Sequence, residues 1–251
     1  MNELHLFAGA GGGILGGLLL GHRPVCAVEI EPYCREVLLQ RQRDGILPWF
    51  PIWDDVRTFD GNPWRGIADV VCGGFPCQDI SAAGNGDGLE GERSGLWGEM
   101  RRVISEVRPR YVFVENSPML TIRGLGRVLG ELAEMGFNAR WGCIPAAYVG
   151  APHGRDRIWI LADTMQVRRN TVEQILPAEY PDLGKLFKPD GIPSGADVRT
   201  FWGRTETERQ ILGEAPICAM DDGMAGWVDE LAALGNGQVP IVAASAWRIL
   251  S

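Results

Sequence analysis

Short apolar runs alternate with longer amphipathic stretches along the first 163 residues. The apolar runs predict strands at 4–7, 24–28, 69–72, 111–114 and 158–161. Apolar residues at helical spacing lie between these runs and predict helices at 11–21, 31–41, 96–107 and 125–135. Such strand–helix alternation predicts an α/β domain built on a mainly parallel sheet.

The pattern changes after residue 163. Periodicity is weak over 164–222, where prolines and glycines are frequent, and this predicts a small irregular lobe. Helical spacing returns at 227–234 and again at 240–250, where Pro240 stands at the start of the predicted helix. We therefore expect three parts, with boundaries at 1–163, 164–222 and 223–251.

Composition narrows the class of protein. No run of 18 apolar residues occurs, so no transmembrane helix is expected, and the first four residues lack the basic start of a signal peptide. The expected location is a reducing cytoplasm, with the six cysteines as free thiols. No CxxC pair is present and His5, His22 and His153 have no ligand spacing, so we predict no metal site.

The charge is unusual for a protein that binds nucleic acid. The net charge of −8 argues against a protein that merely coats a polyanion, since such proteins are basic. The charge is unevenly distributed, however. Residues 101–160 carry nine basic and five acidic side chains, whereas the segments on either side are acidic. A local basic face is therefore compatible with the composition.

A glycine-rich turn follows the first predicted strand. Glycines over 9–13 let the backbone approach a ligand closely, and the helix that follows offers free N–H groups at its start. Glu29 ends the next predicted strand, 20 residues after Gly9, where an acidic side chain binds ribose hydroxyls in nucleotide-binding folds. Together they predict a nucleoside-containing cofactor, which these residues leave open between a nicotinamide and an adenosyl sulfonium.

Three groups of reactive side chains stand at the ends of later strands. Cys77 follows the third strand, and Pro76 restricts the backbone before it. Glu115 and Asn116 end the fourth strand, and an Arg-x-Arg pattern that includes Arg157 begins the fifth. A lone cysteine is usually a buried apolar residue. All three groups in this order favour a catalytic thiol.

This arrangement resembles the DNA (cytosine-5)-methyltransferase family, of the bacterial or phage type with a short target-recognition region. The resemblance extends over the chain except for 164–222. It implies a Rossmann-like S-adenosylmethionine-dependent methyltransferase domain over 1–163, with a mainly parallel doubly wound sheet. It further implies that 164–222 is the target-recognition lobe and that 223–251 returns to the catalytic domain. Ser117 and His153 depart from the family's valine and glutamine, which leaves hydrogen bonding around the base open.

The implied reaction transfers a methyl group from S-adenosylmethionine to C5 of a flipped-out cytosine in duplex DNA and leaves S-adenosylhomocysteine. C5 is a poor nucleophile until a thiolate adds to C6, and this requires Cys77. Glu115 is expected to stabilise charge at N3, Arg157 to hold O2, and Asn116 to position the Cys77 turn. The catalytic residues implied are Cys77, Glu115, Asn116, Arg155 and Arg157.

The same resemblance assigns residues that bind cofactor and DNA. The expected cofactor residues are Phe7, Ala8, Gly9, Gly11, Gly12, Glu29, Ile30, Asp55, Val56, Pro76, Leu96, Asn236 and Gly237. The expected DNA contacts are Gln78, Ser81, Arg93, Arg199, Arg204 and Arg209. The glycine-rich segment 79–95 is expected to close over the flipped base. The expected partner is double-stranded DNA, bound by a monomer in a bacterial cell or phage-infected host.

Two other functions share these catalytic residues. A tRNA cytosine-5 methyltransferase has the same chemistry, and a non-catalytic DNA-binding relative has the same fold. The intact Cys77, Glu115 and Arg157 favour an enzyme, and the segment Gly74–Gln78 favours DNA as substrate. The residues do not reveal the target sequence, the base that removes the C5 proton, or whether the enzyme belongs to a restriction–modification system.

Overall fold

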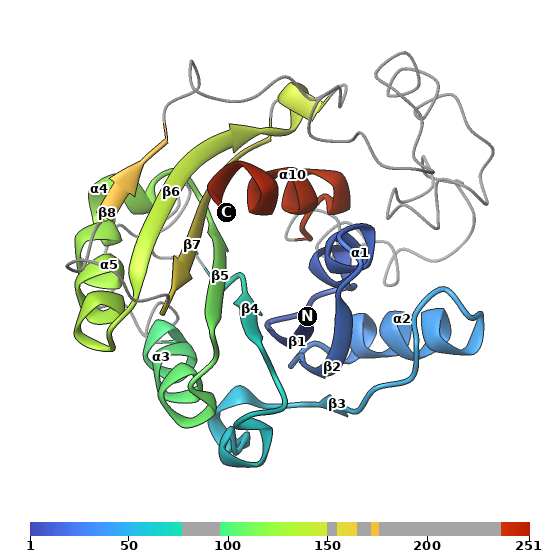
Figure 1. Ribbon diagram of the computed structural model, residues 1–251. Coiled ribbons are helices and arrows are strands. Elements are labelled where there is room, and N and C mark those ends of the chain that lie inside the picture. The colour runs from blue at the N-terminus through green and yellow to red at the C-terminus, as the bar shows by residue number, and fades with distance from the viewer. Residues whose placement is uncertain (77–95, 150–154, 165–171, 176–236) are drawn as a thin grey trace.

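The computed structural model describes residues 1–76, 96–149, 155–164, 172–175 and 237–251. These residues form an eight-stranded sheet flanked by helices (Figure 1). The strands are β1 (Asn2–Leu6), β2 (Arg23–Val28), β3 (Ile52–Trp53), β4 (Val70–Gly73), β5 (Tyr111–Asn116), β6 (Asn138–Pro145), β7 (Asp156–Asp163) and β8 (Val172–Gln174). The α-helices are α1 (Gly12–Leu19), α2 (Pro32–Arg43), α3 (Leu96–Val107), α4 (Leu120–Arg123), α5 (Leu125–Glu134) and α10 (Pro240–Leu250). Short 3-10 helices span Val56–Thr58, Asn62–Trp64 and Ala146–Val149.

The strand order is β3-β2-β1-β4-β5-β7-β6-β8. Strands β1 to β5 pair in parallel, whereas β7 lies antiparallel between β5 and β6. The chain order runs one way from β1 to β3 and the other way from β4, so the sheet has a switch point between β1 and β4. Open α/β sheets bind ligands at the carboxyl ends of the strands beside such a point. The predicted α/β class with a mainly parallel sheet is confirmed.

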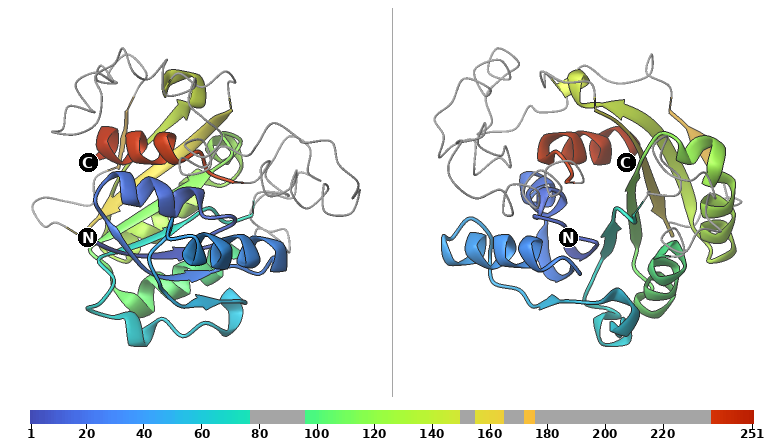
Figure 2. Two further views of the ribbon diagram at one scale, coloured as in Figure 1. Left: turned by 90° about the vertical axis from the view of Figure 1, so that its right-hand side faces the viewer. Right: turned by 180° about the vertical axis from the view of Figure 1, so that it is seen from behind.

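Alternate residues of each strand face opposite layers. On one face Leu4, Val71 and Val112 join a core with α3 and α5. On the other, Cys72 and Phe113 pack against α10. Helices α1 and α10 pack against each other on this second face, and the two views of Figure 2 place them side by side. The sheet is therefore covered on both faces, as the doubly wound prediction requires.

Three strands were not predicted: β3, β6 and β8. Strand β3 has only two residues, too few to show a periodic pattern. In β6 the burial alternates only imperfectly, and the exposed Arg140 and a glycine break the apolar run that reveals the other strands. In β8 three residues pair with β6 inside the segment expected to be irregular. The remainder of the expected lobe, 165–171 and 176–222, lies outside the described residues.

Glycines in α1 permit close packing on that face. A Cβ built on Gly16 would lie 2.8 Å from the Cβ of Ala243 in α10, and one on Gly17 would collide with the Glu3 carboxylate. Any side chain at these two positions would push α1 away from the sheet and from α10. Within the described ranges, no helix has both the length and the apolar character needed to cross a membrane.

Candidate active site

The turn after β1 has the backbone conformation of a ligand-binding loop. Phe7 and Gly9 both have φ of 53°, and Gly11, which precedes α1, has φ of 92°. The left-handed region is costly for Phe7, and such strain is commonly kept where a ligand binds. A Cβ built on Gly9 meets no atom of the described residues within 4 Å, so no described group fills the space beside this turn.

Glu29 closes the turn from the neighbouring strand. Its carboxylate accepts hydrogen bonds from the backbone N–H of Gly9 at 2.6 Å and of Glu31 at 2.8 Å. Burial raises the pKa of this carboxyl, and the two backbone bonds oppose the rise. Each oxygen accepts one bond here, so lone pairs remain for a ligand's hydroxyls. The turn and Glu29 thus fit a ribose-containing cofactor.

The other predicted cofactor residues lie along the same edge of the sheet. Asp55 caps the 3-10 helix that begins at Val56, and hydrogen bonds from Arg57 lower its pKa. Ile30 is half exposed beyond β2, and Leu96 begins α3 and packs on the core. These positions all follow strands or begin helices near the carboxyl edge.

A buried carboxylate–arginine pair stands at the end of β5. The Oε1 atom of Glu115 lies 2.8 Å from Nε of Arg157, which comes from the start of the antiparallel strand β7. Glu115 is 7% exposed. Burial raises its pKa, and the charges of Arg157 and Arg155 only partly oppose that rise. A carboxyl with a raised pKa keeps its proton to higher pH than a free one, which suits it to donate a proton.

Asn116 connects β5 to the segment that precedes Cys77. Its Nδ2 donates to the carbonyl of Phe75 at 3.1 Å, and its Oδ1 accepts from the N–H of Ser117 at 2.8 Å. The amide is buried, so both bonds form away from water. Asn116 therefore fixes the backbone immediately before Pro76 and Cys77.

Gln238 follows the predicted cofactor residue Gly237 directly, but the sequence assigned it no role. This residue precedes α10, and its side chain hydrogen-bonds the Glu115 carboxylate. Beside it, Arg155 donates to the carbonyl of Gly237. In the sequence, 123 residues separate Gln238 from Glu115, so only the fold reveals the contact.

A cavity of about 30 Å³ connects this polar group with the sheet beneath α1. Its walls include Phe7, Gly74, Glu115 and Gln238, together with Glu3 and His5 of β1. A water molecule needs about 10–15 Å³ of such space, so the cavity has room for roughly two.

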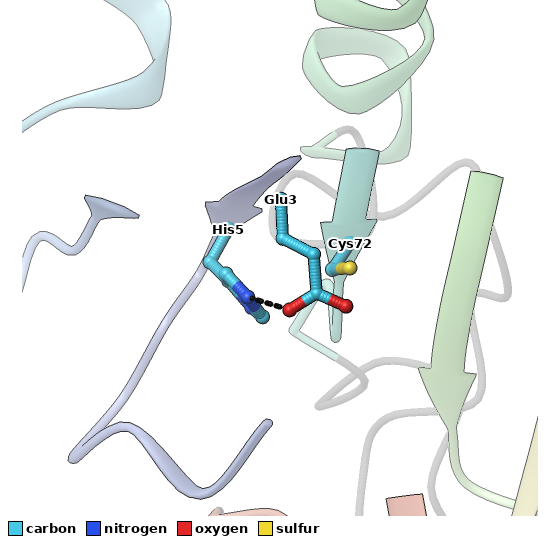
Figure 3. Close-up of side chains that lie close together, drawn as sticks. All are labelled: Glu3, His5 and Cys72. Carbon is cyan, nitrogen blue, oxygen red and sulfur yellow. Dashed lines mark hydrogen bonds and ion pairs between the residues drawn. The ribbon is translucent and has the colours of Figure 1, made fainter. Parts of the chain in front are cut away.

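A buried polar cluster of Glu3, His5, His22 and Cys72 forms part of the cavity wall through Glu3, His5 and Cys72. Figure 3 shows Glu3 and His5 of β1 and Cys72 of β4 on one face of the sheet. His5 lies 2.9 Å from Oε2 of Glu3, and His22 lies 2.7 Å from Oε1. Glu3, His5 and Cys72 each place one possible metal ligand within 4.8 Å of the others, a proximity that spacing could not show. Because both Glu3 oxygens already have imidazole partners, we keep the prediction of no metal.

Replacing Glu3 by glutamine is expected to destabilise the protein by about 3 kcal/mol at neutral pH. Burial alone would raise the Glu3 pKa, but hydrogen bonds from His22 and His5 outweigh it and lower the pKa from 4.5 to about 2. A depressed folded-state pKa stabilises above pH 4.5, and that contribution disappears as pH falls toward 2. Urea unfolding from pH 7 to pH 3 measures it. The exposed Glu36→Gln is the control, and equal stability of both variants across this range would refute the assignment.

Several predicted residues lie outside the described part of the chain. They are Cys77, Gln78, Ser81, Arg93, His153, Arg199, Arg204, Arg209 and Asn236. The expected closing segment 79–95 and most of the expected lobe lie there too. The structure brings together Glu115, Arg157, Asn116 and the turn before Cys77, and it places Arg155 beside them through Gly237.

Fold and site together define a doubly wound α/β protein. It has a glycine-rich turn that fits a nucleoside-containing ligand, and a buried Glu115–Arg157 pair beside the switch point of the sheet. Residues 1–208 match the family described as C-5 cytosine-specific DNA methylase. The chain belongs to this family, which confirms the predicted membership.

Relatives of known activity support the same assignment. The chain is 30% identical over 216 residues to the Type II methyltransferase M2.BsuMI of Bacillus subtilis (strain 168), covering 83% of this chain and 52% of the relative. It is 32% identical over 236 residues to M.Eco47II of Escherichia coli, covering 90% and 54%. The chain spans about half the length of these curated relatives.

Solved structures share the fold. The methyltransferase EhMeth of Entamoeba histolytica superposes with a TM-score of 0.65 at 13% identity, over 99% of this chain and 97% of that one. DNMT2 of Spodoptera frugiperda gives a TM-score of 0.55 at 18% identity, over 76% and 60%. These likenesses support the predicted Rossmann-like fold.

Proposed function

We propose that this protein methylates C5 of cytosine in double-stranded DNA, with S-adenosylmethionine as the methyl donor. The observation that carries the proposal is the buried Glu115–Arg157 pair, next to the Asn116 bond that holds the chain before Cys77. A family described as DNA methylase, and relatives named Type II methyltransferases, support DNA over tRNA as the substrate. They also favour a role in modification beside a restriction enzyme.

The proposed chemistry begins at the thiol. The Cys77 thiolate adds to C6 of the cytosine, the C5–C6 double bond shifts electrons toward N3, and Glu115 delivers a proton there. Arg157 holds the O2 atom with a charge-assisted hydrogen bond. C5, now enamine-like, takes the methyl group as that group's bond to the cofactor's sulfur breaks and leaves S-adenosylhomocysteine. Loss of the C5 proton to a base, elimination of the Cys77 thiolate and return of the N3 proton to Glu115 restore the aromatic ring.

Glu115 must change partners during this sequence. It is paired with Arg157, which neutralises its charge but occupies one of its oxygens. A bound cytosine presents O2 to arginine and N3 to the carboxyl. We propose that the base inserts beside this pair, since a neutral carboxyl donates to N3 and the freed guanidinium reaches O2.

The glycine turn and Glu29 would hold the cofactor. When bound, S-adenosylmethionine supplies an electrophilic methyl group on a sulfonium. The open face of Gly9 permits close approach, and the Glu29 carboxylate retains free lone pairs for ribose hydroxyls. Asp55, Val56, Ile30 and Leu96 stand along the same edge as candidates for the adenine side.

Replacing Glu29 by glutamine is expected to weaken cofactor binding about tenfold, or about 1.4 kcal/mol. The amide of glutamine offers one acceptor oxygen, whereas the backbone N–H groups of Gly9 and Glu31 each require one. Isothermal titration with S-adenosylmethionine measures the change. The variant Glu31→Gln, at an exposed neighbouring position, is the control. An unchanged affinity of Glu29→Gln for S-adenosylmethionine would show that Glu29 does not bind the cofactor.

The test of the function itself is direct. The protein is incubated with labelled S-adenosylmethionine and duplex DNA of mixed sequence, and the product is sequenced for 5-methylcytosine. Competing tRNA in a parallel reaction tests the RNA alternative. Methylation of cytosine C5 in DNA supports the proposal and reveals the target site. Label in tRNA alone would instead indicate a tRNA cytosine-5 methyltransferase. Tight DNA binding without turnover would indicate a non-catalytic DNA-binding protein.

The remaining assignments concern the DNA. We propose that segment 79–95 closes over the flipped base and that the region 164–222 reads the target sequence, with Arg199, Arg204 and Arg209 as candidate contacts. Both proposals rest on the family resemblance. Binding should weaken strongly between low and moderate salt, because arginine–phosphate contacts release counterions.

A further inference from the structure

Gln238 occupies the point where three parts of the site meet. It precedes α10, faces the carboxylate at the end of β5, and lies over the start of α1. A Cβ built on Gly74 would lie 2.7 Å from Oε2 of Glu115 and 3.2 Å from Nε2 of Gln238. The two side chains therefore converge beside the same glycine of the segment that leads to Cys77.

The chemistry fixes which end of the amide faces Glu115. An ionised carboxylate only accepts hydrogen bonds, so the amide nitrogen must be the donor. Arg157 lies against Oε1. The Glu115 carboxylate thus has a charged donor from β7 and a neutral donor from the segment before α10, and the two hold its plane.

The backbone of Gln238 reaches the cofactor turn. A Cβ built on Gly12 would collide with the carbonyl of Gln238, and one on Gly13 would collide with its side-chain oxygen. The absence of side chains at these two glycines therefore makes room for Gln238 at the start of α1. Glycine is required there by the packing of Gln238, and not only by the approach of a cofactor. On its other side, the carbonyl of Gly237 accepts from Arg155.

We propose that Gln238 is a positioning residue that orients Glu115 for proton delivery and couples it to the glycine turn. The inference rests on the proposed methyltransferase function. Gln238 touches no reacting atom in this role. Gln238 acts through Glu115, and the glycine turn also packs against Gln238. The conformation of the turn and the orientation of the Glu115 carboxyl therefore depend on each other.

The role predicts a particular pH dependence. Among the described residues, the charged groups that face Glu115 are Arg157 and Arg155, with Gln238 as a neutral donor. Glu3, His5 and Cys72 line the same cavity, and His5 approaches the same glycine of α1 as Gln238. The Gln238 hydrogen bond stabilises the charged form and lowers the Glu115 pKa. Removing the bond should therefore raise that pKa and move the alkaline limb of the rate profile to higher pH.

Two variants test the proposal from opposite sides. Gln238→Leu keeps much of the volume and removes the donor. Gly74→Ala leaves the donor in place and inserts a methyl group between the two side chains. For both we expect kcat to fall about tenfold or more, as for loss of a hydrogen bond to a charged group. We expect KM for DNA to stay within about twofold, because neither change removes a DNA contact.

The measurement is kcat and KM from pH 5 to pH 9, with thermal unfolding to verify the fold. Gln40→Leu, at an exposed position on α2, is the matched control. A shift of the alkaline limb to higher pH in either folded variant supports the proposal. An unchanged limb in every folded variant, or a loss that lies in KM alone, overturns it. Absence of methylation by the wild type would instead refute the proposed function.

Discussion

Alanine at position 77 is expected to abolish methylation, with a residual rate below about 10⁻⁴ of the wild type. Removing a catalytic nucleophile costs factors of this size or larger in enzymes that form covalent intermediates. Without addition at C6, C5 stays too weak a nucleophile to accept a methyl group. The fold should survive, because Asn116 holds the segment before Cys77 through the backbone carbonyl of Phe75 and not through the thiol.

A trapping experiment separates loss of chemistry from loss of binding. A duplex that carries 5-fluorocytosine has no C5 proton to lose, so a thiol adduct formed on it persists. The wild type should form a covalent complex that survives denaturing electrophoresis, and Cys77→Ala should not. Cys143→Ala, at a half-buried cysteine in β6, is the control and should trap normally. Methylation by Cys77→Ala at the wild-type rate would exclude it as the nucleophile.

Glutamine at position 115 is expected to lower kcat by about 10²- to 10⁴-fold, the range for loss of a general acid. The change keeps the shape of the side chain and removes the group that titrates. It also leaves Arg157 without its counter-charge at 2.8 Å, so the guanidinium is held less firmly. The pKa of Glu115 is raised by burial, and the wild-type rate should therefore fall on the alkaline side as this carboxyl ionises.

Controls for this variant distinguish chemistry from binding. The alkaline limb should disappear from the Glu115→Gln profile, while affinity for S-adenosylmethionine stays within about twofold. Glu134→Gln, at an exposed position at the end of α5, should match the wild type. A kcat within about threefold of the wild type in Glu115→Gln would show that Glu115 does not deliver the proton.

Features that depend on neighbours in the chain could be predicted from the sequence. The glycine turn and Glu29 are linked through two adjacent parallel strands, so a spacing of 20 residues gave their proximity. The acid at the end of β5 follows from the apolar run before it. Strand β6 was not predicted because its alternation of apolar residues is interrupted. Its pairing with β7 determines its position more than its own residues do.

Features that depend on distant pairing could not be predicted. Glu115 meets Arg157 because β7 enters the sheet antiparallel, which brings the start of one strand to the end of another. The Arg-x-Arg pattern does not show that its strand runs antiparallel to β5. Gln238 and the two histidines around Glu3 likewise acquire their partners only when α1 and α10 cover the sheet.

The contact between α1 and α10 also bears on how the protein is made. These helices are more than 200 residues apart in the chain, yet they share a face through Gly16 and Ala243. Contacts of such long range form late in folding, because the chain must close a large loop first. On the ribosome, strands β1 to β5 emerge long before α10, so the part of the sheet face that α10 covers stays open on the nascent chain. Synthesis of α10 is therefore the step that both ends this exposure to aggregation and completes the surroundings of Glu115.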